Sequence, residues 1–151
     1  MRTRTSVWFE IKIRYDKVQE DGLVKKVTEQ YVVDALSFTE AETSITENMK
    51  LFISGDFKVS AIAYAAYGEI FFSDKDLADK WYKAKLQFIT IDEKTEKEKK
   101  STVTYLVQAA SLDEAKVNIN EVMGSTMFDY TIHSIVETQI MDVFEHKTSN
   151  E

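Results

Sequence analysis

The segment Lys25–Met49, KKVTEQYVVDALSFTEAETSITENM, decides the fold, because a closely similar segment returns at Lys99–Met123 as KKSTVTYLVQAASLDEAKVNINEVM. Placed on each other at a shift of 74 residues, the two segments are identical at 12 of 25 positions. Internal similarity of this kind marks one supersecondary unit that is used twice. The sequence therefore predicts a duplication, in which every element of the first copy returns in the second.

Upstream of each segment, apolar and polar residues alternate with a period of two, in WFEIKIRY at residues 8–15 and in WYKAKLQF at residues 81–88. This period is typical of a strand with one buried face. Asp21 and Gly22 follow the first strand and supply the positive backbone dihedral angle of a hairpin turn. The corresponding connection, residues 92–100, is a mixed-charge run that predicts a solvated, mobile loop.

Each duplicated segment contains a helix start. Ser37 and Glu40 form a capping box, in which the serine hydroxyl accepts from the glutamate N–H and the carboxylate reaches back to the serine N–H. Ser111 and Glu114 repeat it. Gly55 and Gly124 are expected to end the helical regions. The apolar residues of each helix recur at helical spacing and predict one buried stripe per helix: Ala41, Ile45, Met49 and Phe52; Ala115, Ile119, Val122 and Met123.

The first helix is followed by residues 57–72, which are predicted to form one bent strand or two short ones with a bulge at Gly68. The second helix is followed by a last strand that continues to about Phe144. The expected class is α+β, an internal duplication of a β-β-α-β unit that forms two antiparallel sheets, each with one helix packed on one face. The expected organisation is one compact body, made of residues 1–73 as first repeat, 74–80 as connector, 81–146 as second repeat and 147–151 as a frayed tail.

A sheet with one helix across it buries only one face, so the residues of opposite phase need cover. They are too many and too large to remain wet. We expect this face to pack on its counterpart or on another subunit; the alternative is a stacking platform for bases, with Lys12, Arg14 and Lys85 as phosphate partners. The candidate interaction face consists of Trp8, Val32, Ile62, Tyr64, Trp81, Leu106 and Ile135.

Charge disfavours several partners. With 19 basic and 26 acidic residues the net charge is −7, which repels nucleic acid and anionic membranes. The exception is a basic start, which offers candidate phosphate contacts at Arg2, Arg4, Lys12 and Arg14. No apolar run approaches the ~20 residues that span a bilayer. There is no cysteine, which excludes disulfides and thiolate chemistry, and no secretory signal is recognisable, so a cytoplasmic protein is expected.

No constellation of catalytic residues is apparent. His133 and His146 have no spacing that suggests a metal site, and no glycine-rich phosphate loop or nucleophile–base motif occurs. The carboxylates fall at helix starts and in loops, where solubility and the helix dipole explain them. We therefore expect no enzymatic activity, no metal and no cofactor.

At MRTRT, WFEIKIRY, KVTEQYVVDALSFTEAE and WYKAKLQF, the chain resembles a family of uncharacterised proteins from Bacteroidetes genomes and from their viruses or mobile elements. The resemblance covers nearly the whole length and implies a bacterial, cytoplasmic or phage-related setting, with no active-site residue carried over. The duplicated order of elements also resembles, more distantly, the small ribosomal protein of the L-x type, which is strongly basic whereas this chain is acidic.

Three functions remain open on the sequence. The first is a non-enzymatic interaction or structural accessory module, acting on a protein partner or on itself through the tryptophan-bearing face or the aromatic segment 64–72. The second is a nucleic-acid-binding accessory protein that uses the arginine-rich start and the sheet aromatics. The third is a small-molecule pocket lined by tyrosines between the two halves.

Overall fold

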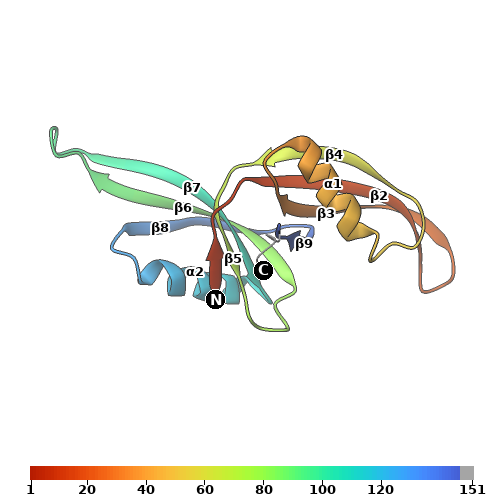
Figure 1. Ribbon diagram of the computed structural model, residues 1–151. Helices are drawn as coiled ribbons and strands as arrows, with labels where there is room; N and C mark the ends of the chain where they lie inside the picture. Colours follow the sequence, from red (N-terminus) through yellow and green to blue (C-terminus); the bar gives the residue numbers. More distant parts are fainter. Residues whose placement is uncertain (147–151) are drawn as a thin grey trace. The chain divides into compact units, whose positions relative to one another are not determined.

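The computed structural model describes residues 1–146; the predicted frayed tail, 147–151, lies outside the described residues. The described chain forms two helices and nine strands (Figure 1). In chain order they are β1 (Arg2–Arg4), β2 (Trp8–Val18), β3 (Val24–Asp34), α1 (Phe38–Met49), β4 (Phe57–Ala65), β5 (Tyr67–Phe72), β6 (Lys80–Ile91), β7 (Glu98–Ala109), α2 (Leu112–Gly124), β8 (Asp129–Glu137) and β9 (Ile140–Phe144).

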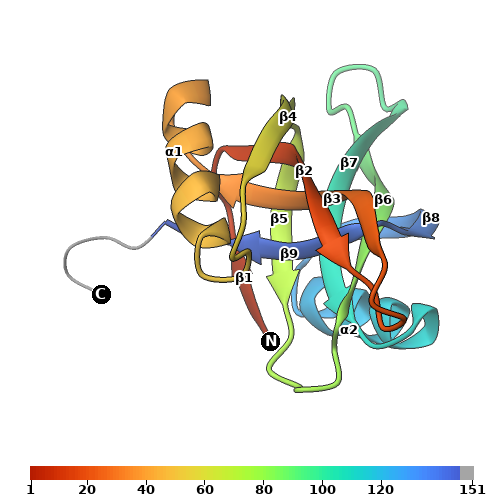
Figure 2. The same cartoon turned by 90° about the vertical axis from the view of Figure 1, so that its right-hand side faces the viewer.

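The duplication is visible in this order of elements. Each copy contains a hairpin, a helix and two further strands: β2, β3, α1, β4 and β5 in the first copy, and β6, β7, α2, β8 and β9 in the second. The α+β class and the packing of each helix on a sheet are confirmed: α1 lies along β2, β3 and β4 (Figures 1 and 2), and α2 packs on β7 and β8. Strand β1 precedes both copies.

The copies exchange their last strands. One sheet has the order β1-β5-β7-β6-β8 and the other the order β4-β2-β3-β9, so β5 of the first copy pairs with β7 of the second, and β9 pairs with β3. The chain accordingly divides into unit 1 (Met1–Thr5 and Tyr67–Thr138) and unit 2 (Ser6–Ala66 and the segment from Gln139). These compact units do not coincide with the sequence repeats.

The exchanged strands also correct the predicted sheet type. Both exchanged pairs, β5 with β7 and β9 with β3, are parallel, while the other pairs are antiparallel, so both sheets are mixed and not antiparallel throughout.

The two hairpins turn differently. Gly22 has φ +83°, as predicted for the Asp21–Gly22 turn, and Val18 lies opposite Val24. In the second hairpin the predicted loop 92–100 is too long: Glu98 already pairs with Ile91, and the N–H of Asp92 donates to the Lys97 carbonyl at 2.9 Å. The mixed-charge run is thus largely a tight turn and the start of a strand.

Both capping serines act as predicted, with the backbone N–H of Glu40 donating to Ser37 Oγ and that of Glu114 donating to Ser111 Oγ, each at 3.1 Å. The Glu40 carboxylate accepts from the backbone N–H of Leu36, at 3.2 Å, and not from that of Ser37. The helix stripes are buried as predicted, except for Val122, which is partly buried, and Phe52, which lies beyond the end of α1 at Met49 and is 69% exposed.

Bulges recur at equivalent positions and correct three face assignments. Ser60 in β4 and His133 in β8, 73 residues apart, are each the extra residue of a register shift. The alternation reverses there, so Ile62 lies opposite Ile11, and Ile135 lies opposite Ala84, on the helix-covered faces. Tyr64, beyond the same bulge, packs edge-to-face on Phe9. These three residues, Ile62, Tyr64 and Ile135, therefore do not share a face with the tryptophans.

Candidate functional site

Strand β4 forms an exposed edge of the sheet in unit 2. Strand β4 is the end strand of its sheet and pairs only with β2, so the backbone groups on its outer side have no partner strand within that sheet. The side chains along it are also accessible: Lys58, Ser60, Ala61 and Ala63 are exposed, and Tyr64 is 62% exposed. Such an edge is a template for pairing with another chain.

Beyond the exposed Lys58 near its start, the edge has little protection against pairing. From Val59 to Ala66 the sequence is VSAIAYAA, with no charge and no proline, which are the residues that usually blunt an edge strand. The bulge at Ser60, whose hydroxyl donates to the Lys12 carbonyl at 3.2 Å, is the one such device in this stretch. The equivalent edge strand of unit 1, β8, has its charges at its two ends, Asp129 and Glu137, and Glu137 is 3.8 Å from Lys80.

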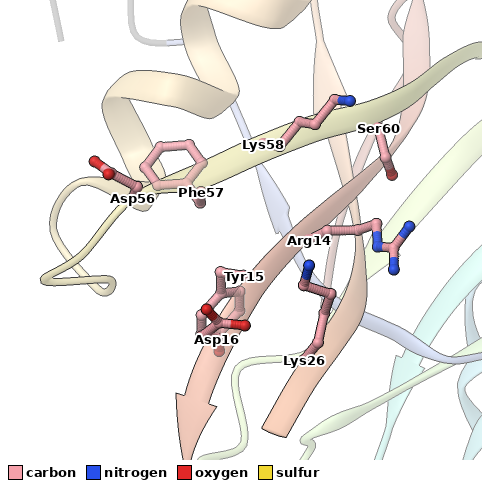
Figure 3. A pocket seen from close by; sticks show the side chains of 8 residues that line it. All are labelled: Arg14, Tyr15, Asp16, Lys26, Asp56, Phe57, Lys58 and Ser60. Atoms are coloured by element: carbon pink, nitrogen blue, oxygen red, sulfur yellow. The ribbon is translucent and has the colours of Figure 1, made fainter. Parts of the chain in front are cut away.

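A hollow of about 570 Å³ lies at the sheet face beside the start of β4. Three cationic side chains line it from three neighbouring strands, Lys58 from β4, Arg14 from β2 and Lys26 from β3 (Figure 3). We call this the basic hollow. Its remaining lining residues are Tyr15, Asp16, Asp56, Phe57 and Ser60.

Two of the cations are held side by side. Arg14 lies directly opposite Lys58 across the β2–β4 pair. Like charges in directly opposite positions of a sheet destabilise it. Within residues 1–146, neither side chain takes part in an ion pair. The arrangement therefore favours an anion between them.

The second copy has no such pair. At the equivalent position Gln87 lies opposite Thr131, which are both neutral. Because the same strand pairing forms with and without the charges, Arg14 and Lys58 are not required to build the sheet. Their clustering is a property of the first copy alone.

A second hollow, of about 800 Å³, lies on the helix side of the same strand. It is formed where the chain leaves α1 and enters β4, and it is more neutral than the basic hollow. Its lining residues are Glu42, Thr46, Lys50, Ile53, Ser54, Gly55, Asp56, Phe57, Lys58 and Val59. The first residues of β4 are thus flanked by a hollow on each side.

The predicted interaction face is only partly available. Trp8, Val32 and Leu106 have no exposed surface, and Trp81 is 2% exposed, with its ring edge-to-face with Phe72 at 5.7 Å. Fully buried side chains of this kind stabilise the fold and offer no surface to a partner. In the aromatic segment 64–72, Tyr64 is the exposed ring, because Tyr67, Phe71 and Phe72 are buried.

The predicted phosphate contacts are divided between the two units. Arg2 and Arg4 belong to β1, which pairs with β5 in unit 1, and the Arg2 guanidinium lies 4.1 Å from the Phe72 ring centre. Lys12 and Arg14 belong to β2 in unit 2, where both are exposed. Sequence reasoning missed Lys26 and Lys58, because only the strand register shows that they line the same hollow as Arg14.

A group of ionisable residues lies on the helix-side face of the first hairpin. Tyr31 Oη donates to the Glu29 carboxylate at 3.2 Å, and Lys17 Nζ lies 4.0 Å from the same carboxylate. Burial, with a hydrogen bond to Glu29, raises the pKa of Tyr15 to about 12, and burial beside the Glu29 charge raises the pKa of Tyr31 further. Both phenols are therefore neutral hydrogen-bond donors at physiological pH.

Residues 1–146 contain no group of three histidine, aspartate or glutamate side chains placed to hold a metal ion. Neither helix in that range has the length and apolar character needed to cross a membrane.

The sequence model of a family described as Domain of unknown function (DUF4494) matches residues 7–146. The chain belongs to this family. The matched range contains both copies of the repeat, both exchanged strands and the whole of the basic hollow, so these features lie within the DUF4494 domain. No curated protein and no solved structure matches the chain.

Proposed function

We propose that the chain is a non-enzymatic interaction module that captures an extended segment of a partner protein by adding it as a strand beside β4. The observation that supports this function best is the combination of an outer strand without a neighbour and an uncharged stretch, residues 59–66, along it. Strand addition is a common mode of peptide recognition, in which main-chain hydrogen bonds supply affinity and flanking pockets supply specificity.

The two hollows beside β4 supply the pockets. Alternate side chains of an added strand point to opposite faces of the sheet. One set would point to the side of the basic hollow, lined by Arg14, Lys26 and Lys58, and the other set to the side of the hollow near Lys50 and Ile53. The module therefore offers both backbone pairing and side-chain selection at one edge.

The setting that we propose is a bacterial cytoplasm, in a process related to phages or mobile elements, with a protein or a second copy of the chain as partner. The support is the resemblance carried by WFEIKIRY and KVTEQYVVDALSFTEAE, together with the cysteine-free composition.

A nucleic-acid-binding accessory protein is the second candidate. The observation that favours it is the gathering of Lys12 and Arg14 on β2 with Lys26 and Lys58 in neighbouring strands. This function predicts binding of DNA or RNA that falls steeply as salt rises, with a slope set by the number of phosphates neutralised. A salt titration with a single-stranded oligonucleotide distinguishes it from strand addition, in which main-chain hydrogen bonds dominate.

The test of strand addition is a hydrogen-exchange experiment with a panel of four extended peptides. Each peptide alternates threonine and valine and differs only at its central residue, which is glutamate, glutamine, lysine or leucine. We expect at least one peptide to slow exchange in β4 and none to do so in β8, the matched edge of unit 1. If no peptide protects β4, or if β8 is protected equally, strand addition at β4 is wrong.

A further inference from the structure

We propose that the basic hollow selects an acidic side chain on the partner segment that adds to β4. This inference rests on the proposed function and specifies its partner: an extended protein segment with an aspartate or glutamate opposite Lys58. The charges that carry it are those of Lys58 and Arg14, because Lys26, the third cation of the hollow, lies directly opposite Asp16.

The register of the sheet places these charges within reach of such a side chain. Neighbouring strands lie about 4.7–4.9 Å apart, and directly opposite residues share one face. A partner residue opposite Lys58 would therefore stand in line with Lys58 and then Arg14, which already face each other across β4 and β2. Arginine presents a planar fork of donors that matches a carboxylate, and lysine adds a second positive charge.

Two acidic residues of the hollow favour the binding of a single carboxylate over that of a longer polyanion. Asp16 and Asp56 line the same hollow as the three cations. A single carboxylate on the added strand would face Lys58 directly, whereas a nucleic-acid backbone would bring successive phosphates toward these two aspartates. The net charge of −7 adds repulsion of polyanions at long range.

The chain supplies its own control residues. Replacing Arg14→Gln and Lys58→Thr gives unit 2 the pair found at Gln87 and Thr131, which the equivalent strands accommodate. The double variant removes both charges, relieves their mutual repulsion and keeps side chains that suit a strand. Loss of the preference for the glutamate peptide in this variant therefore reports on charge and not on folding.

The experiment measures the binding of the same four peptides by fluorescence anisotropy, for the natural chain and for the double variant Arg14→Gln, Lys58→Thr. We expect the natural chain to bind the glutamate peptide about fivefold more tightly than the glutamine peptide and to bind the lysine peptide most weakly, since partly exposed ion pairs contribute up to about a factor of five each. The double variant should bind the glutamate and glutamine peptides equally. The preference should also shrink at high salt, because salt screens exposed charges.

The outcomes separate this inference from the proposed function. If glutamate and glutamine peptides protect β4 equally and bind the natural chain equally, strand addition stands and acidic selection is wrong. If no peptide protects β4, the proposed function fails first. If a single-stranded oligonucleotide binds more tightly than the glutamate peptide and loses that binding in the double variant, the hollow serves nucleic acid and the inference is overturned.

Discussion

Gly68 of β5 lies against Val103 of β7 so closely that a Cβ atom on the glycine would stand 2.5 Å from Val103 Cγ1. Gly68 is also the extra residue of the register shift between Tyr67 and Glu69, as the sequence predicted, and its counterpart 73 residues later, Met141, occupies the equivalent shift in β9. The glycine thus marks a place where an exchanged strand approaches the other copy too closely for a Cβ atom.

Replacing Gly68→Ala is expected to lower the free energy of unfolding by about 1–3 kcal/mol, because the new methyl group overpacks the contact with Val103. Urea unfolding measures the change. In a chain that already has Val103→Ala, the replacement Gly68→Ala should lower the free energy of unfolding by less than it does in the natural chain. Replacements at two residues in contact are coupled in this way. Gly55→Ala is the matched control, since a Cβ there meets nothing within 4 Å; an equal effect at Gly55 would contradict the packing explanation.

Removing either capping serine should destabilise the chain by about 1 kcal/mol, because the N–H of Glu40 or Glu114 loses its acceptor. Ser37→Ala and Ser111→Ala are expected to have similar effects in thermal unfolding, whereas Ser37→Asp should be nearly neutral because aspartate is also a good cap. A loss confined to one of the two serines would mean that the two helix starts are not energetically equivalent.

Stability should decrease as the pH rises from 10 to 12, in part through Tyr15. Burial raises the pKa of Tyr15 in the folded chain from 10.0 to about 12, so the unfolded chain releases this proton first. Alkaline pH therefore favours unfolding, and the contribution of Tyr15 is complete below pH 10 and lost through about pH 12. Tyr15→Phe should have a shallower decline than the natural chain in urea unfolding across this range; identical declines would exclude Tyr15 as a source.

The strand exchange predicts that a change in the second copy destabilises the sheet of the first. Ile140 in β9 is 4% exposed, and Ile140→Asp should lower the free energy of unfolding by more than about 2 kcal/mol because it buries a charge. Hydrogen exchange should accelerate in β3, the partner of β9, more than in β7.

Met141→Asp is the control for this experiment, because Met141 is adjacent in β9 but 52% exposed. It should leave exchange in β3 nearly unchanged. If Ile140→Asp instead accelerates exchange mainly in β7, β9 does not stabilise unit 2 in solution.

Local patterns were enough to predict the two hairpins and the two helix starts, because period-two alternation, the Asp21–Gly22 turn and the Ser37 cap act within a few residues. They did not predict β1 or the division of the last strand into β8 and β9. They failed where one extra residue changes the phase. Ser60 looks like any polar residue of a strand, yet as a bulge it moves Ile62 and Tyr64 to the helix-covered face. The equivalent bulge at His133 is equally undetectable in the sequence, because only the register of β8 against β6 reveals it.

The exchange and the basic hollow were equally hidden from sequence reasoning. Residues 57–72 fit one long strand as well as two, and nothing in the alternation indicates that β5 joins another sheet. Lys26 and Lys58 lie 12 and 44 positions after Arg14, so their common hollow depends on pairings between β2, β3 and β4 that alternation alone does not specify. Long-range pairing, and not local preference, determines both features.

The exchanged strands also determine when each sheet can be completed during synthesis of the chain. The ribosome makes β9 after β1 to β8, yet β9 completes the sheet of the early-made β2 and β3. The outer side of β3 consequently stays unpaired until the second copy has emerged, which is a period of exposure to aggregation. Contacts this distant in sequence also slow folding. A nascent chain stalled before Gln139 would expose the unpaired edge of β3, and we expect chaperones to bind it.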